Sequence, residues 1–147
     1  TAVATGTGFA PLVEPVGLML FCIMFLWQLP HFFAIAWMCR IDYELGGFRM
    51  LPIVDPIGNH TAATMVITSA LLIPAGLLPL RITPELSGWA TGAASVLLGL
   101  MMVWLSLKFA ISRSDKAAKV AFFGSIIHLP VYLIVLVAEA GVRGLLL

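Results

Sequence analysis

The sequence predicts an all-α protein, a polytopic bundle of transmembrane helices, and three observations support that prediction. Hydrophobic residues make up 61% of the 147-residue chain and charged residues only 10%, whereas a soluble domain is roughly 25% charged. Four apolar stretches are each long enough to cross a bilayer, which takes ~20 mainly apolar residues in a helix. Turn-forming residues separate the stretches. One small core could not bury so much apolar surface, so we expect an integral membrane protein.

Each expected span ends at residues that favour turns. The first is followed by the double glycine of E-L-G-G-F and by P-I-V-D-P-I-G, the second by T-P-E and the third by S-R-S-D. The final segment, GVRGLLL, is too short to span. We expect a single membrane domain over residues 1–147, with spans at residues 15–38, 61–80, 87–111 and 120–138.

The distribution of lysine and arginine predicts the orientation in the membrane. The first and third loops share one side of a four-span chain and carry Arg40, Arg49, Lys108, Arg113, Lys116 and Lys119. Only Arg81 and Arg143 lie on the other side. By the positive-inside rule, residues 39–60 and 112–119 face the cytoplasm at a bacterial inner membrane, or the matrix at a mitochondrial one. The net charge of +1 excludes the strongly basic surface typical of nucleic-acid binding.

Polar residues end the first span, in W-Q-L-P-H-F-F-A-I-A-W-M-C-R-I-D-Y, where lipid would favour none of them. At about 100° per residue, Gln28, His31 and Asp42 share one stripe if the helix continues to Asp42, and Trp27 flanks it. Pro30 frees a backbone carbonyl that only protein or water can satisfy. Gln28 alone could simply hydrogen-bond a neighbouring helix. Because ionisable residues in a membrane usually mark functional cavities, we expect the full stripe to line one.

A carboxylate, two arginines and a tyrosine above an apolar cavity suit a diphosphate ester with a lipid tail. Asp42 would hold Mg²⁺, which prefers carboxylate and water oxygens, and Arg40 and Arg49 would bond phosphate. Simpler interpretations stay open: the arginines as the positive-inside signal, and Tyr43 as an interfacial anchor. Asp42 could be a solvated loop acid, which is what we expect of Asp55.

Three elements carry a family resemblance: W-Q-L-P-H-F at 27–32, R-x-D-Y at 40–43 and G-F-R-M-L-P at 47–52. They resemble the signature of the protoheme IX farnesyltransferase (heme O synthase) branch of the UbiA-type intramembrane prenyltransferases. The resemblance continues through the rest of the chain and covers what would be the C-terminal half of a member. It implies an all-helical bundle of about nine spans around a central cavity.

The resemblance also implies residue roles. Asp42 corresponds to the second acidic motif, where it would bind the metal and diphosphate, and Arg40 and Tyr43 would line the same catalytic pocket. His31, within the P-H-F element, is expected to contact the heme substrate. The remaining expected binding residues are Trp27, Gln28 and Arg49.

The implied reaction moves the farnesyl group from farnesyl diphosphate to a vinyl carbon of protoheme IX, and water then supplies a hydroxyl to give heme O for terminal oxidase assembly. Mg²⁺ and cationic side chains would stabilise charge on the leaving diphosphate, and a dry cavity would protect the allylic cation. Heme B is then a substrate, and Mg²⁺ is the cofactor. Implied partners are membrane lipid, the two substrates and, further, heme A synthase or oxidase assembly proteins.

The main departure from the family lies in residues 1–41. The family carries a first acidic motif, of the N-x-x-x-D-x-x-x-D style, on an earlier helix, and nothing here matches it. The chain also begins at Thr1 rather than at Met. We therefore expect the C-terminal half of a longer enzyme, inactive by itself. Smaller departures are Gly46 in place of alanine, and Asn59 and His60 where basic residues are frequent.

Three other functions stay open. A heme-carrying bundle with His31 and His128 as axial ligands would leave Arg40 and Asp42 unexplained. Another UbiA-type enzyme, acting on an aromatic acid or quinone precursor, is disfavoured by W-Q-L-P-H-F. A scaffold or assembly subunit is supported only by the missing motif. For His128 itself, we expect a hydrogen bond to a neighbouring helix rather than a place on the cavity wall.

Overall fold

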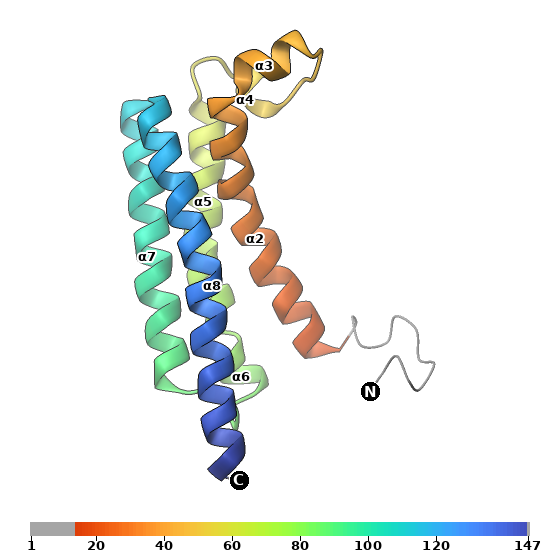
Figure 1. Cartoon of the computed structure of the whole chain (residues 1–147), viewed down its shortest axis with the longest axis vertical. Coiled ribbons are helices and arrows are strands. Elements are labelled where there is room, and N and C mark those ends of the chain that lie inside the picture. Colours follow the sequence, from red (N-terminus) through yellow and green to blue (C-terminus); the bar gives the residue numbers. More distant parts are fainter. Residues whose placement is uncertain (1–13, 147) are drawn as a thin grey trace.

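A computed structural model describes residues 14–146, and every regular element among them is a helix. The elements are α2 (Pro15–Met38), α3 (Arg40–Leu45), α4 (Leu51–Val54), α5 (Asn59–Gly76), α6 (Pro79–Ile82), α7 (Trp89–Ser112) and α8 (Asp115–Leu146). The four long helices form one bundle, and the three short ones lie in its connections (Figure 1). The expected all-α bundle is confirmed.

In this bundle α5 and α8 each pack against both α2 and α7. Small residues bring α5 and α7 close together: the hydroxyls of Ser69 and Ser106 are 2.9 Å apart, and Ser95 donates to the Ile73 carbonyl at 2.9 Å. A Cβ on Gly99 would overlap Ile73. Small residues and interhelical hydrogen bonds are the usual means of association where lipid removes the hydrophobic drive between helices.

Two apolar clusters fill the bundle, one near each end. One includes Trp37, Met65 and Phe109, and the other includes Ile23 and Tyr132. Since α2 contributes to both clusters, its W-Q-L-P-H-F element lies between them, at mid-height in the bundle.

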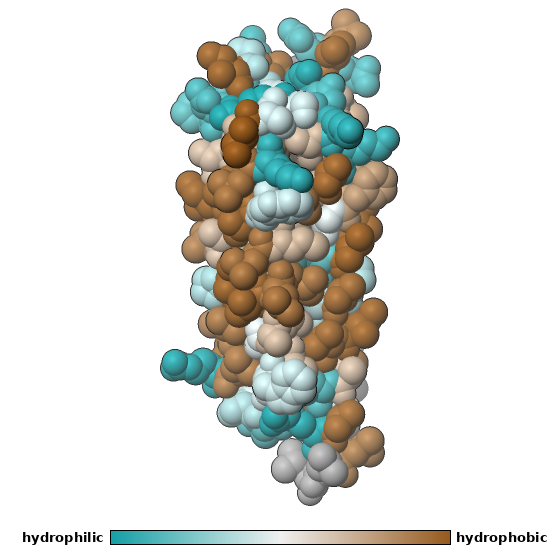
Figure 2. All heavy atoms as spheres, turned by 90° about the vertical axis from the view of Figure 1, so that its left-hand side faces the viewer, coloured by the Kyte–Doolittle hydropathy of each residue, from teal (hydrophilic) through white to brown (hydrophobic). Residues whose placement is uncertain are grey.

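All four long helices are apolar and long enough to cross a membrane, as an integral membrane protein requires. Figure 2, which faces α7, shows an apolar band between two hydrophilic ends, the upper of which carries more hydrophilic residues. The first and third connections share that end, as predicted, and the second lies at the other (Figure 1). We call the end with residues 39–58 and 113–114 the loop end, and the end with residues 77–88 the closed end.

The expected first span matches α2, and the expected second, over residues 61–80, lies within the apolar stretch Asn59–Ile82, which is long enough to cross a membrane. This stretch is helical in two parts, since α5 ends at Gly76 and the short α6 begins at Pro79. Prolines lie on both sides of the step, at positions 74 and 79. A proline supplies no backbone donor, so the helix is weakened there.

The third expected span agrees closely with its helix, whereas the helix that contains the fourth is longer than expected. The third runs from Trp89 to Ser112, close to the expected 87–111. The fourth was expected over 120–138, but α8 begins at Asp115 and continues to Leu146, within the GVRGLLL segment. The Ser114 hydroxyl caps it by accepting from the Ala117 N–H at 3.2 Å. Hydropathy detects only the apolar part of a helix. The start of α8 is set by its cap and lies before the apolar part.

Candidate functional site

The prediction that Gln28, His31 and Asp42 share one polar stripe is wrong, because α2 does not continue to Asp42. It breaks at Cys39, which has φ −99° and ψ 16°, and α3 then leans away from the bundle (Figure 1). Arg40 donates to the Trp37 carbonyl at 2.6 Å, a carbonyl that a continuous helix would offer to the backbone N–H four residues on. His31 and Asp42 therefore lie on separate, diverging helices.

Trp27 and His31 do come together, at the contact between α2 and α8. Their rings stack with centroids 4.8 Å apart, and the His31 ring lies 4.9 Å from that of Phe122 on α8. The Trp27 indole N–H donates to the Ser125 carbonyl at 2.6 Å, and His31 Nδ1 lies 2.8 Å from Ser125 Oγ. Both rings are only half-buried, so the cluster is a formed but accessible aromatic wall.

The hydrogen bonds of Ser125 favour one tautomer of His31. The Ser125 hydroxyl donates to the Phe122 carbonyl at 2.6 Å, and a hydroxyl has one proton to give. Both contacts form together only if Ser125 Oγ accepts from His31, which favours the tautomer with the imidazole proton on Nδ1. His31 Nε2 then carries the lone pair and can accept a hydrogen bond or bind a metal.

Ser125 and Phe122 belong to the site although sequence reasoning did not assign them to it. The available signal was Ser125, a polar residue in an apolar helix one turn before His128. Nothing in the pattern linked it to α2, because the His31–Ser125 contact joins positions 94 residues apart.

Gln28 lies one residue from Trp27 but does not join the cluster. It is exposed, and it makes no hydrogen bond to any residue of the described chain. A side-chain amide at this depth cannot be left in hydrocarbon without a polar partner. This side of α2 therefore has the character of a cavity wall or helix interface.

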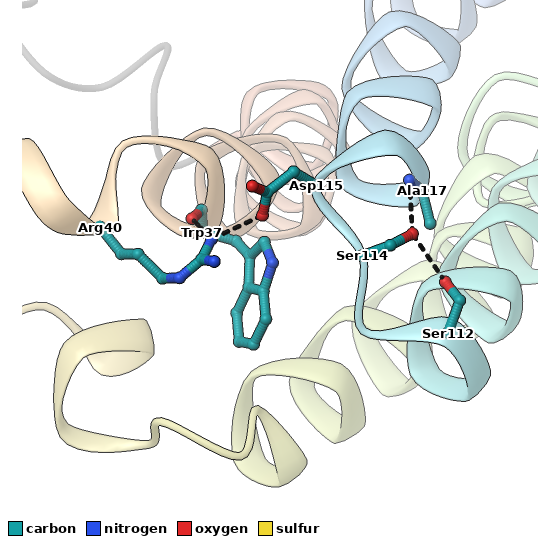
Figure 3. Close-up of polar contacts among 6 residues, drawn as sticks. All are labelled: Trp37, Arg40, Ser112, Ser114, Asp115 and Ala117. Carbon is teal, nitrogen blue, oxygen red and sulfur yellow. Dashed lines mark hydrogen bonds and ion pairs between the residues drawn. The ribbon is translucent and has the colours of Figure 1, made fainter.

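Arg40 is held on the loop end by three contacts (Figure 3). Its Nη1 donates to Asp115 Oδ1 and to the Trp37 carbonyl, both at 2.6 Å, and its guanidinium lies 4.8 Å from the centre of the Trp37 ring. Asp115, the first residue of α8, was expected only as a turn residue. The contacts tie α3 to the start of α8 and keep the arginine in place.

Asp42, Tyr43 and Arg49 stand apart from Arg40. Asp42 lies in the first turn of α3 and is exposed, as is Arg49. Tyr43 is half-buried and meets the Phe48 ring edge-on at 6.2 Å. The shallow pocket beside Arg40 is lined by none of these three residues. The described chain thus places the expected diphosphate residues at one end of the bundle without closing a common pocket around them.

A metal site is not complete within residues 14–146, where no three carboxylate, imidazole or thiol groups come together. Asp42 nevertheless has the donor chemistry that Mg²⁺ uses, an accessible carboxylate. Mg²⁺ commonly binds one or two carboxylates, with water and substrate phosphates completing its ligands. The chain therefore fits a partial metal site with one protein ligand.

Asp55 is not the solvated loop acid that was expected. It is buried, and its carboxylate accepts from the Asn59 and Thr61 N–H groups at 3.1 and 2.9 Å and from the Thr61 hydroxyl at 3.2 Å. Burial raises the pKa of Asp55, but bonds from the backbone of Thr61, Asn59 and His60 and from the Thr61 hydroxyl outweigh burial and hold it below its ordinary value. Asp55 caps the start of α5 and is a structural residue.

His128 also differs from expectation. It is 3% exposed, and its Nδ1 has no hydrogen-bond partner among the described residues. Its ring stacks with that of Tyr132, whose hydroxyl donates to the Gly76 carbonyl at 2.8 Å. The void beside it has no space for a water molecule. His128 is thus packed inside the bundle, which disfavours a heme held between it and His31.

Known proteins resemble the chain over most of its length. The model of the UbiA prenyltransferase family matches residues 1–127. A protoheme IX farnesyltransferase of Salinibacter ruber is 42% identical over 75% of this chain and 38% of its own length. Proteins of the same name from Opitutus terrae and Solibacter usitatus are 40% and 38% identical, over 86% and 84% of this chain and 43% and 42% of their own lengths. No solved structure matches.

The chain spans about two fifths of the length of these curated relatives. The family match nonetheless covers well over half of the chain, and the described fold is the helical membrane bundle that the resemblance implied. The chain belongs to the UbiA prenyltransferase family.

Proposed function

We propose that this chain is part of a membrane enzyme that transfers a farnesyl group from farnesyl diphosphate to a vinyl carbon of protoheme IX, giving heme O. The observation that carries the proposal is its similarity to relatives named for this transfer, at 38 to 42% identity. Each relative is more than twice as long as the matched region, so the activity is proposed for the longer protein, with this chain as one membrane domain.

The aromatic wall of Trp27 and His31 supports a heme-binding role for α2. Flat aromatic rings suit a porphyrin face, and both Trp27 and His31 are held by contacts with Ser125. The unprotonated Nε2 of His31 can meet the heme iron or a polar edge of the porphyrin. Gln28, exposed on the same helix, adds an amide that can bond a propionate.

The loop end supports a diphosphate-binding role. Asp42 would contribute one ligand to Mg²⁺, which when bound neutralises diphosphate oxygens. The guanidinium groups of Arg40 and Arg49 donate hydrogen bonds suited to phosphate, and the Tyr43 hydroxyl adds a neutral donor. Together they stabilise negative charge on the leaving group, while the apolar helices shield the allylic cation from water.

We further propose that the loop end faces the cytoplasm at a bacterial inner membrane, or the matrix at the mitochondrial one. Most of the basic residues lie at this end. Farnesyl diphosphate would then bind where its charged head stays in water and its tail enters the bilayer. The heme O product leaves within the membrane, where heme A synthase or oxidase assembly proteins are its natural recipients.

The decisive test is Asp42→Asn in the full-length protein, with heme O extracted from membranes and quantified by chromatography. We expect a loss of roughly 10²-fold or more, as for removal of other groups that stabilise transition-state charge. Glu44→Gln is the matched control, since Glu44 is an exposed acid on the same short helix; its heme O output should stay within about twofold of wild type.

Normal heme O from Asp42→Asn would refute the metal role of Asp42, and equal losses in the two variants would reduce it to a general charge effect. Absence of heme O with the wild-type full-length protein and both substrates would refute the function itself.

A further inference from the structure

A groove of about 370 Å³ lies between the end of α7 and the start of α8, apart from the residues assigned above to heme and diphosphate. Leu105, Ile111 and Val120 supply an apolar wall, and Lys108 and Lys116 supply basic groups. None of the residues lining it is acidic. The groove is therefore amphipathic, with positive charge as its only formal charge.

The two lysines are available to an anion in the described chain. Lys116 is exposed and joins none of the ion pairs there. Lys108 extends over the exposed Trp104 ring, with Nζ 3.7 Å from the ring centre, an arrangement that leaves other sides of the ammonium open. The neighbouring acid, Asp115, is paired with Arg40 at 2.6 Å (Figure 3), which reduces its repulsion of an anion.

The serine hydroxyls in the groove are already engaged. Ser112 donates to the Lys108 carbonyl at 2.9 Å, and its oxygen is 3.2 Å from that of Ser114 (Figure 3). Both contacts of Ser112 form together only if Ser114 donates to Ser112, and Ser114 also accepts from the backbone N–H of Ala117. The ammonium groups are thus the side-chain donors left for a ligand.

The groove lies at the edge of the membrane. The apolar span of α7 ends at Ser112, and that of α8 begins at Asp115, so the lysines stand near the surface and the apolar wall extends into the bilayer. A phospholipid presents the same order of groups, a phosphate at the surface and acyl chains below. Basic pockets between transmembrane helices on the cytoplasmic side are a known means of binding anionic lipid headgroups.

We propose that this groove is a binding site for an anionic phospholipid of the bilayer. The phosphate lies between Lys108 and Lys116, and an acyl chain follows the wall formed by Leu105 and Val120. The proposal does not depend on the reaction that the protein catalyses.

The proximity of Trp104 provides the test. The full-length protein is reconstituted in phosphatidylcholine vesicles with a fixed fraction of phosphatidylglycerol, and either lipid is labelled with bromine on its acyl chains. Quenching of Trp104 is taken as the difference between the protein and its Trp104→Phe variant. We expect stronger quenching by brominated phosphatidylglycerol, with a relative affinity of roughly fivefold for each lysine.

Lys108→Gln with Lys116→Gln should reduce this preference by about tenfold or more. Comparing the two lipids within each variant cancels any change in Trp104 emission caused by loss of the Lys108 contact. The matched control is Lys119→Gln, since Lys119 is an exposed lysine of α8 that does not line the groove; its preference should stay within about twofold of wild type.

Three outcomes would overturn the proposal. Equal quenching by the two lipids would show a non-selective surface. An effect of Lys119→Gln as large as that of the double variant would show attraction by general charge. No quenching by either lipid would show that another part of the full-length protein covers the groove.

Discussion

At each end of the bundle, a carboxylate that is largely withdrawn from solvent caps the start of a long helix. At the loop end, Asp55 accepts from the backbone N–H of Thr61 on α5 at 2.9 Å. At the closed end, Glu139 of α8 accepts from the backbone N–H of Thr91 on α7 at 2.8 Å and from its hydroxyl at 2.7 Å. The Asp55 cap is local, whereas Glu139 also joins two helices that are distant in sequence.

The ends differ in the charges that remain beyond these caps. At the closed end, Arg143 Nε lies 3.8 Å from Glu139, and a Cβ on Gly88 would overlap the guanidinium. At the loop end, Asp42 and Arg49 are exposed, and neither takes part in an ion pair of the described chain. At the closed end Glu139 joins α7 to α8, whereas Asp42 and Arg49 at the loop end remain available for a ligand.

The largest expected effect tests whether the caps hold the fold. Glu139→Ala leaves the N–H groups of Ala90 and Thr91 without their acceptor, so we expect a loss of roughly 2–4 kcal/mol in the free energy of unfolding. Asp55→Ala should cost a similar amount, and Asp42→Ala should change it by less than about 0.5 kcal/mol. SDS-induced unfolding of the full-length protein measures all three, and equal losses would remove the distinction between capping and exposed acids.

A smaller effect concerns pH at the loop end. The folded-state pKa of Asp55 is depressed, so its contribution to stability is complete above its ordinary pKa of 3.8 and is lost as the pH falls through the lower folded-state pKa. Acidification below about pH 4 should therefore destabilise the wild type more than Asp55→Asn. The loss should be smaller than for Asp55→Ala, because a protonated carboxyl still accepts hydrogen bonds.

Unfolding of the wild type and of Asp55→Asn at pH 7 and pH 3 measures this difference. If the two proteins lose stability in parallel, the Asp55 carboxylate is not the group whose protonation weakens the loop end.

The smallest expected effect is that of the Arg40–Asp115 pair. Both side chains are partly exposed, 34% and 63% respectively, and exposed pairs contribute about 0.2–1 kcal/mol because water screens them. A double-mutant cycle of Arg40→Gln and Asp115→Asn should give a coupling free energy in that range. A coupling above about 2 kcal/mol would place the pair among the structural contacts, as at the closed end.

Much of the fold could be predicted because it depends on properties that lie along the chain. The apolar stretches and turn residues indicated four spans and the shared position of the first and third loops, and the structure agrees. Helix ends were less predictable: the start of α8 depends on a cap from Ser114, and the break of α2 coincides with the turn of Arg40 back to the Trp37 carbonyl. Neither contact can be predicted from a hydropathy pattern.

By itself, the sequence determined that the chain is a membrane-embedded helical bundle of the UbiA type, because hydropathy and a local motif depend only on residues that are neighbours in the sequence. Only the tertiary structure decided that Ser125 orients His31, that Asp115 holds Arg40 and that Glu139 caps α7. These contacts join positions 94, 75 and 48 residues apart. Hydrogen bonds act over about 3 Å, so partners that distant in sequence are chosen by helix packing and not by spacing along the chain.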